Sequence, residues 1–168
     1  LPYQHPNGAN HRQLECQCLS WYHNIQDQRK KRNIKMSGRK IITIGNPLLK
    51  KKSKSVKKIT RQVKNLINEM TDIMYKNNGC GLAAVQVGEL QRVILIDISE
   101  NRDNLMIIIN PKITNKSGEI TWKEGCLSVP GMEGDVKRFK KVTVKGKNER
   151  FEDIEIPAED YLAVAIQH

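Results

Sequence analysis

Aromatic residues are scarce in this chain of 168 residues: two Trp, four Tyr and two Phe make up 5% of it. A surface that stacks nucleic-acid bases on aromatic rings needs more of them, so direct DNA binding is not expected. Acidic residues are also in the minority, because 18 Asp and Glu face 29 Lys and Arg, and the net charge is +11. The four cysteines are too few for a disulfide-held scaffold of this length, which favours a reducing, cytoplasmic location.

The chain also lacks a long apolar run. A membrane-spanning helix needs about 20 consecutive apolar residues, and no stretch of this sequence approaches that length. No apolar segment follows a basic start, so a secretory signal peptide is not expected either. The remaining composition, with 38% hydrophobic residues, suits one domain that is large enough to bury a substantial core.

The first 35 residues differ in character from the rest. They hold three of the four His and two of the four Cys, and they show no aliphatic periodicity. We therefore predict that residues 1–35 are an unstructured or artefactual N-terminal extension, and that the folded domain begins at Met36.

Two helices and several strands are expected after Met36. Apolar residues recur with the 3.6-residue period of a helix from Val63 to Met74, and Thr60 stands where an N-cap is needed. A second helix, opening at Pro157, is apolar on nearly every side, which is typical of a buried central helix. The mixture indicates an α+β fold. A β-branched run lies at 39–44, and strands are expected at 92–98, 105–110, 112–114, 119–122, 141–145 and 152–156.

The segment at 79–86 reads Gly-Cys-Gly-Leu-Ala-Ala-Val-Gln and joins the first helix to the strand at 92. Its two glycines let the backbone approach a ligand closely. Gln86 ends the run with a side-chain amide that donates hydrogen bonds. The same residues also suit a helix C-cap followed by a buried connection, so the segment alone leaves both interpretations open.

Two further segments contain candidate metal ligands. Cys126, in Glu-Gly-Cys-Leu-Ser at 124–128, suits a metal thiolate, a nucleophile or a small buried hydrophobe. His168 ends the apolar helix, where an imidazole needs a polar partner, so it is either a satisfied core residue or a ligand. In metal sites with His-Glu-x-x-His, one helix face carries two imidazoles, and Gln167-His168 suits the start of such a pattern.

Taken in order, the segments at 79–86, 124–128 and 167–168 resemble the three signature motifs of the peptide deformylase family. The first two motifs are complete, and their length and order make the resemblance highly specific. It covers residues 36–168. It implies an α+β fold of several short, mostly antiparallel strands packed around a central buried helix, which carries a metal-ligand His, plus one N-terminal amphipathic helix.

The resemblance implies a metal-dependent hydrolase that removes the N-terminal formyl group from formyl-methionine of nascent polypeptides and releases formate. Cys126 and His168 would hold one divalent ion. The family uses Fe²⁺ and accepts Zn, Ni or Co in its place. Such an ion lowers the pKa of its bound water from about 15.7 towards 7. The Gln86 amide and the backbone N–H of Leu127 would hold the developing oxyanion.

The implied partners are formyl-methionyl peptides and, transiently, the ribosome, with no membrane. An apolar slot suits the unbranched thioether of methionine, and Cys80, Trp122 and Val164 would form it. The residues implied to bind the substrate are Gly79, Cys80, Gly81, Trp122, Glu124 and Val164.

The sequence departs from the family pattern after His168 and at Asp160. The family's catalytic Glu directly follows this His, and its second His ligand lies four positions on, so both would fall beyond residue 168. We therefore expect the chain to be C-terminally truncated, to lack the catalytic Glu and, expressed alone, to bind metal poorly with negligible activity. Asp160 stands where the family often has Gly, which leaves the geometry at the start of the second helix open.

Two other functions fit parts of the sequence. The basic runs at 50–64 and 137–150 suit a ribosome- or nucleic-acid-binding module, whose binding would fall steeply with salt. Cys126 as nucleophile and His168 as base would instead make a thiol hydrolase. A chelator distinguishes this second alternative, because a Cys-His pair keeps its activity without metal and loses it to an alkylating agent.

Overall fold

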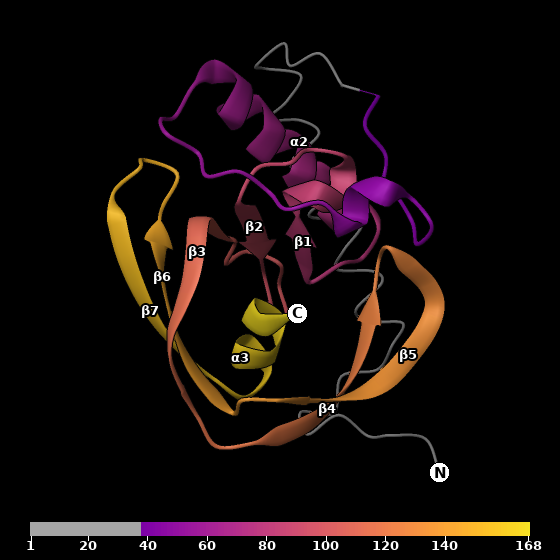
Figure 1. The fold of residues 1–168 in the computed structure, drawn as a ribbon, viewed down its shortest axis with the longest axis vertical. Coiled ribbons are helices and arrows are strands. Elements are labelled where there is room, and N and C mark those ends of the chain that lie inside the picture. Colours follow the sequence, from indigo (N-terminus) through magenta and orange to yellow (C-terminus); the bar gives the residue numbers. More distant parts are fainter. Residues whose placement is uncertain (1–37) are drawn as a thin grey trace.

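The computed structural model describes residues 38–168; the extension predicted at 1–35, and Met36, lie outside them. The described residues form a five-stranded sheet, a separate two-stranded sheet and two α-helices. Figure 1 shows one of these helices at the top of the molecule and the other near its middle. The elements in chain order are η1 Pro47–Lys50, α2 Arg61–Lys76, β1 Gly81–Ala83, η2 Ala84–Val87, β2 Val93–Ile96, β3 Met106–Ser117, β4 Ile120–Cys126, β5 Val129–Arg138, β6 Lys141–Lys147, β7 Asp153–Glu159 and α3 Asp160–Gln167.

The larger sheet has the order β1-β2-β3-β6-β7, and every neighbouring pair in it is antiparallel. Strands β4 and β5 form the smaller sheet, also antiparallel. Helix α3 lies between the two sheets (Figure 1), because its Tyr161 stacks on Trp122 of β4 while Ile166 packs with apolar residues of the larger sheet. The prediction of an α+β fold with mostly antiparallel strands around a central helix is confirmed.

Each helix covers one part of the apolar core. Helix α2 begins after Thr60, whose side chain accepts a hydrogen bond from the N–H of Val63, and it buries Met70 and Met74 completely against β1 and β2. Helix α3 buries Ala163 and Ile166 in a second cluster with β2, β3, β6 and β7. No helix in the described part of the chain is long and apolar enough to cross a membrane.

Two local expectations about strands differ from the structure. The β-branched run at 39–44 forms no strand, and its backbone donates single hydrogen bonds, from Ile42 to the carbonyl of Gln86 and from Ile44 to that of Ser128. Strand β5, which is mostly exposed and polar, was not expected at all. The strands expected at 105–110 and 112–114 are one strand, β3, which continues through Pro111 with a shift in its pairing register.

The expected start of the second helix at Pro157 is wrong. Pro157 lies inside β7, opposite Thr143 of β6, and the helix starts three residues later. Strand β7 is the edge of the larger sheet, and an edge strand tolerates the missing N–H of a proline. The helix-opening preference of proline is therefore overridden by strand pairing.

Asp160, where the chain turns from β7 into α3, has a left-handed backbone with φ of +50°. This conformation favours glycine, because a Cβ crowds the following carbonyl. We therefore expect Asp160→Gly to raise the free energy of unfolding by about 0.5–1 kcal/mol. This is the net effect: glycine relieves the strain in the folded state, and its greater flexibility in the unfolded chain offsets part of that gain. Urea denaturation measures it. Asp160→Asn, which keeps the Cβ, should not give this gain, and a lower stability of the Gly variant would contradict the argument.

Candidate active site

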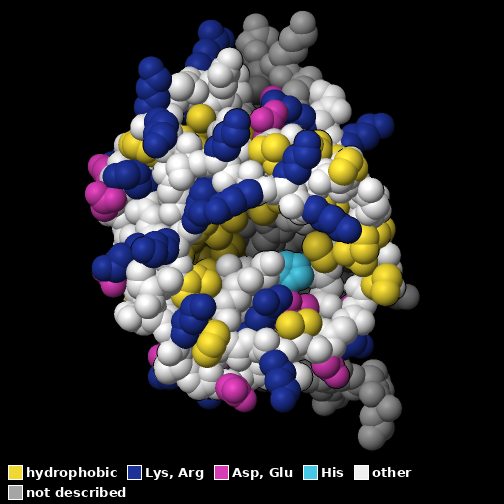
Figure 2. All heavy atoms as spheres, in the orientation of Figure 1, with side chains coloured by type: hydrophobic (Ala, Val, Ile, Leu, Met, Phe, Trp, Pro, Cys, Tyr) yellow, Lys and Arg dark blue, Asp and Glu magenta, His cyan; other side chains and the backbone are white. Residues whose placement is uncertain are grey.

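A cavity of about 1060 Å³ opens between β1, the β4–β5 sheet and α3. Figure 2 shows this hollow, with apolar side chains inside it and basic side chains around its mouth. All the residues that the sequence singled out for the site line this one cavity, although they come from three separate segments. They are Gly79, Cys80, Gly81, Gln86, Trp122, Glu124, Cys126, Leu127, Val164 and His168.

The first segment is held tightly where it leaves α2. Gly79 is buried, and a Cβ at this position would lie only 2.6 Å from Cδ1 of Leu127, so glycine allows the two segments to approach this closely. A side chain here would displace the Leu127 side chain from its present position. The carbonyl of Gly79 accepts a hydrogen bond from Nη1 of Arg102 at 2.5 Å, and that of Cys80 accepts one from the N–H of Asp97 at 2.9 Å. These bonds fix the backbone that forms one wall of the cavity.

The orientation of the Gln86 amide follows from its neighbours. Its Oε1 accepts a hydrogen bond from the backbone N–H of Ala83 at 2.9 Å, and only an oxygen can do so. Its Nε2 therefore points the other way, 3.1 Å from Oγ of the buried Ser128 and 3.6 Å from Sγ of Cys126. Gln86 thus presents N–H donors to the cavity beside a cysteine sulfur.

Cys126 ends β4 at a break in the hairpin register. Gly125 pairs with Glu133, whereas Cys126 pairs with Val129, so the ladder shifts between these two neighbours. Such irregularities re-aim a side chain at the end of a strand. Cys126 is half-buried, is not in a disulfide and lines the cavity.

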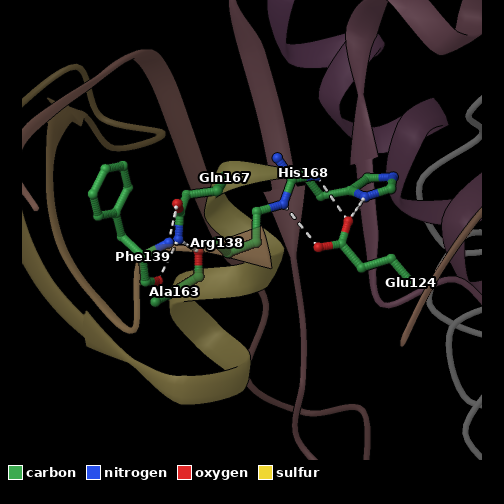
Figure 3. Close-up of polar contacts among 6 residues, drawn as sticks. All are labelled: Glu124, Arg138, Phe139, Ala163, Gln167 and His168. Atoms are coloured by element: carbon green, nitrogen blue, oxygen red, sulfur yellow. Dashed lines mark hydrogen bonds and ion pairs between the residues drawn. The ribbon is translucent and has the colours of Figure 1, made fainter. Parts of the chain in front are cut away.

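Glu124, Arg138 and His168 form a connected polar group, drawn in Figure 3. Both carboxylate oxygens of Glu124 accept hydrogen bonds of 2.8 Å from the guanidinium of Arg138. Oε2 of Glu124 also lies 2.6 Å from Nδ1 of His168. Arg138, followed by the hydrogen bond with His168, holds the pKa of Glu124 below its ordinary value even though burial opposes this.

The charge on Glu124 determines how the His168 ring is used. An ionised carboxylate only accepts hydrogen bonds, so Nδ1 of His168 must carry a proton. In the neutral ring, Nε2 then keeps its lone pair.

The last turn of α3 is held in place by Gln167. Its Oε1 accepts a hydrogen bond from the backbone N–H of Phe139, and its Nε2 donates one to the carbonyl of Phe139 (Figure 3).

Comparison with known proteins agrees with this geometry. The model of the family described as polypeptide deformylase matches residues 38–168. The chain belongs to this family. It is 50% identical over 129 residues to the peptide deformylase of Carboxydothermus hydrogenoformans, covering 77% of this chain and 83% of that protein. It is 46% identical over 125 residues to the peptide deformylase of Halothermothrix orenii, covering 74% and 80%.

Solved deformylase structures share the fold. A crystal structure of a peptide deformylase from Legionella pneumophila superposes with a TM-score of 0.76 at 40% identity, covering 79% of this chain and 78% of that one. A peptide deformylase from Synechococcus elongatus in complex with actinonin superposes with a TM-score of 0.74 at 34% identity, covering 78% and 71%.

Deformylases are metal-dependent, and the donor atoms of this cavity fit a transition-metal ion. A cysteine sulfur and an imidazole nitrogen are ligands that such ions prefer. Ligating imidazoles almost always donate their second N–H to a carboxylate, a backbone carbonyl or a water molecule, and His168 has such a partner in Glu124. Within residues 38–168, no group of three or more His, Cys, Asp and Glu side chains has the arrangement of a metal site.

Three residues that line this cavity or contact its lining had no role assigned from the sequence. Ser128 receives a hydrogen bond from Gln86, and Arg138 pairs with Glu124. Tyr161 lies against Trp122 and Cys80 in the cavity wall. Ser128 is part of the second motif, whereas Arg138 and Tyr161 lie outside the three motifs, and no local pattern indicated the contacts of Tyr161.

Arg138→Met is expected to destabilise the protein, because Glu124 is only 6% exposed and would lose both bonds to the guanidinium. The expected loss is about 2–3 kcal/mol in the free energy of unfolding, measured by urea denaturation. Arg138→Lys should recover only part of it, since an ammonium cannot make the paired bonds. Lys123→Met is the matched control on the same hairpin: its pair with Glu133 is exposed on both sides, so an equal loss there would contradict the explanation.

Proposed function

We propose that this chain is a peptide deformylase, which hydrolyses the amide between formate and the N-terminal methionine of nascent polypeptides. The observation that carries the proposal is the meeting of three distant segments in one cavity. They bring the Gln86 amide to the Cys126 sulfur and the Glu124 carboxylate to the His168 ring. Membership of the polypeptide deformylase family and the names of the relatives support it.

In this proposal, Cys126 and His168 hold one divalent ion, with Fe²⁺ as the ion used in the cell and Zn, Ni or Co as substitutes. When bound, such an ion acts as a Lewis acid and lowers the pKa of a water molecule towards neutrality. Glu124 is a positioning residue, because its carboxylate keeps the proton of His168 on Nδ1 and so directs Nε2 to the ion.

The developing negative charge on the formyl oxygen needs hydrogen-bond donors. Gln86 is suited to this role, since Ala83 fixes its amide with Nε2 towards the cavity and its Nε2 carries two protons, one of which is directed at Ser128. We propose the backbone N–H of Leu127 as the second donor. Donors of this kind contribute about 3–4 kcal/mol each to transition-state stabilisation.

The substrate would lie along the first segment. We propose that Gly79 and Gly81 allow its backbone to approach, and that Cys80, Trp122 and Val164 surround its first side chain. The free thiols of Cys80 and Cys126 suit a cytoplasmic protein. Contact with the ribosome is proposed for the basic segment at 50–64, whose eight Lys and Arg side chains are exposed.

Formate release tests the function. The protein, loaded with Fe²⁺ without oxygen or with Co²⁺, is given formyl-Met-Ala-Ser and, as a control, acetyl-Met-Ala-Ser. We expect formate from the first peptide, no cleavage of the second, loss of activity with a chelator and recovery with metal. Activity that persists with the chelator and disappears on alkylation would identify a thiol hydrolase instead.

A further inference from the structure

Tyr161 occupies a position that no signature motif includes, in the first turn of α3. Its ring stacks on Trp122 of β4, with 5.3 Å between the ring centroids and 20° between their planes. Its hydroxyl donates a hydrogen bond of 3.0 Å to Sγ of Cys80. Tyr161 therefore joins the helix, the small sheet and the first motif at one wall of the cavity.

The surroundings keep this hydroxyl protonated. Burial raises the pKa of Tyr161, and the hydrogen bond to Cys80 raises it further. A thiol sulfur is a weak acceptor, so the Tyr161 hydroxyl loses little hydrogen-bond energy when another acceptor replaces the Cys80 sulfur. Val164, one turn further along α3 and almost completely buried, makes the adjoining part of the wall apolar.

This wall differs chemically from a plain aliphatic slot. A thioether sulfur makes favourable contacts with aromatic rings and accepts a weak hydrogen bond. A methylene group in the same place gains neither contact. Two stacked rings and one available hydroxyl thus distinguish methionine from norleucine, which has the same length and shape but CH₂ in place of sulfur.

We infer that Tyr161 is a specificity-determining residue of this site: with Trp122 it selects a sulfur-containing first side chain over an all-carbon one, while Cys80 holds the hydroxyl when no substrate is bound. The inference rests on the proposed deformylase function and adds a determinant of its substrate preference. In the bound state, the Tyr161 hydroxyl turns from Cys80 to the thioether of the substrate, while its ring stays on Trp122.

The test compares formyl-Met-Ala-Ser with formyl-norleucine-Ala-Ser, using the metal-loaded protein. The measured quantity is the ratio of the two kcat/KM values. Tyr161→Phe keeps the ring and removes the hydroxyl, so it should lower the ratio about threefold, and Tyr161→Leu, which also removes the stack, about tenfold. Cys80→Ala removes the competing acceptor and should raise the ratio.

A binding measurement accompanies the kinetics. Calorimetry on the metal-free protein with Met-Ala-Ser and norleucine-Ala-Ser should give the same order of preference, because these peptides keep the side chain and lack the formyl group. Phe151→Leu is the control for loss of an aromatic ring, since Phe151 lies outside the cavity lining. It should leave the ratio unchanged.

The outcomes are distinguishable. If the wild-type protein releases formate but Tyr161→Phe keeps the wild-type ratio, or Cys80→Ala lowers it, the inference about Tyr161 is wrong and the proposed function stands. If no protein releases formate from either peptide, the proposed function fails, and the calorimetric ratio alone decides whether Tyr161 selects sulfur. Equal losses on both peptides would show a merely structural role and overturn the inference.

Discussion

Cys126→Ala is expected to lose its metal ion and to lower kcat/KM on a formyl-methionyl peptide by about 1000-fold or more. Cys126 is one of two candidate ligands among residues 38–168. A metal ion contributes several kcal/mol of transition-state stabilisation, and each loss of about 1.4 kcal/mol lowers the rate tenfold. The fold should survive, because the side chain is half-buried and alanine keeps the backbone pairing with Val129. Metal per chain and kcat/KM are the measurements.

Cys80→Ala is the matched control for this loss of a thiol. Cys80 is also not in a disulfide and lines the same cavity. It accepts a hydrogen bond from Tyr161 and is not a proposed ligand, so the Cys80→Ala variant should keep its metal. A Cys126→Ala protein that retains a full equivalent of metal would contradict the ligand assignment. If it also lost all activity, it would support the thiol hydrolase.

Gln86→Glu is expected to lower kcat by about 100- to 1000-fold with little change in stability. The carboxylate is nearly isosteric with the amide and still accepts the hydrogen bond from Ala83, but it has no N–H for a developing oxyanion. It also places a negative charge 3.6 Å or so from the Cys126 sulfur, where Nε2 now lies. Single-turnover kinetics with formyl-Met-Ala-Ser separate the chemical step from binding.

Gln62→Glu carries the same charge change on the exposed side of α2 and should leave the rate unchanged. Metal content must be measured for both variants, because a Gln86→Glu protein that loses its metal would owe its slow rate to a different cause. Wild-type kcat in a metal-loaded Gln86→Glu protein would rule out Gln86 as an oxyanion donor.

Regular amphipathic structure was predictable from the sequence. The 3.6-residue period and Thr60 located α2 closely, and five of the six apolar residues of that pattern are buried in the structure. A helix of 16 residues with one apolar face carries this signal in its own sequence. Strands β2, β6 and β7 were also placed correctly to within a few residues.

The remaining elements depend on partners that are distant in the sequence. Strand β5 is largely exposed and has no alternating pattern, so its strand conformation comes from pairing with β4. Pro157 sits in a strand for a similar reason, because β6 pairs with the backbone around it. Local preferences around these residues favour turns or a helix start, and tertiary pairing overrides them.

The candidate site shows the same division. Short motifs were enough to locate Gln86, Cys126 and His168, since their residue types and order carry the resemblance. The contact between Tyr161 and Cys80 joins residues 81 positions apart and depends on the path of β7 into α3. No local pattern encodes such a contact, so it became visible only in the folded chain.

The order of the strands bears on how the enzyme folds and fails. The chain between Cys126 and His168 forms β5, β6, β7 and α3, and β6 pairs with β3. Closing such a long loop costs entropy, which these strand pairings help to offset. We therefore expect the cavity to assemble late in folding and to be among the first regions to open when the sheet edge at β7 separates. Substitutions in that remote strand would then inactivate the enzyme without touching a single group in its cavity.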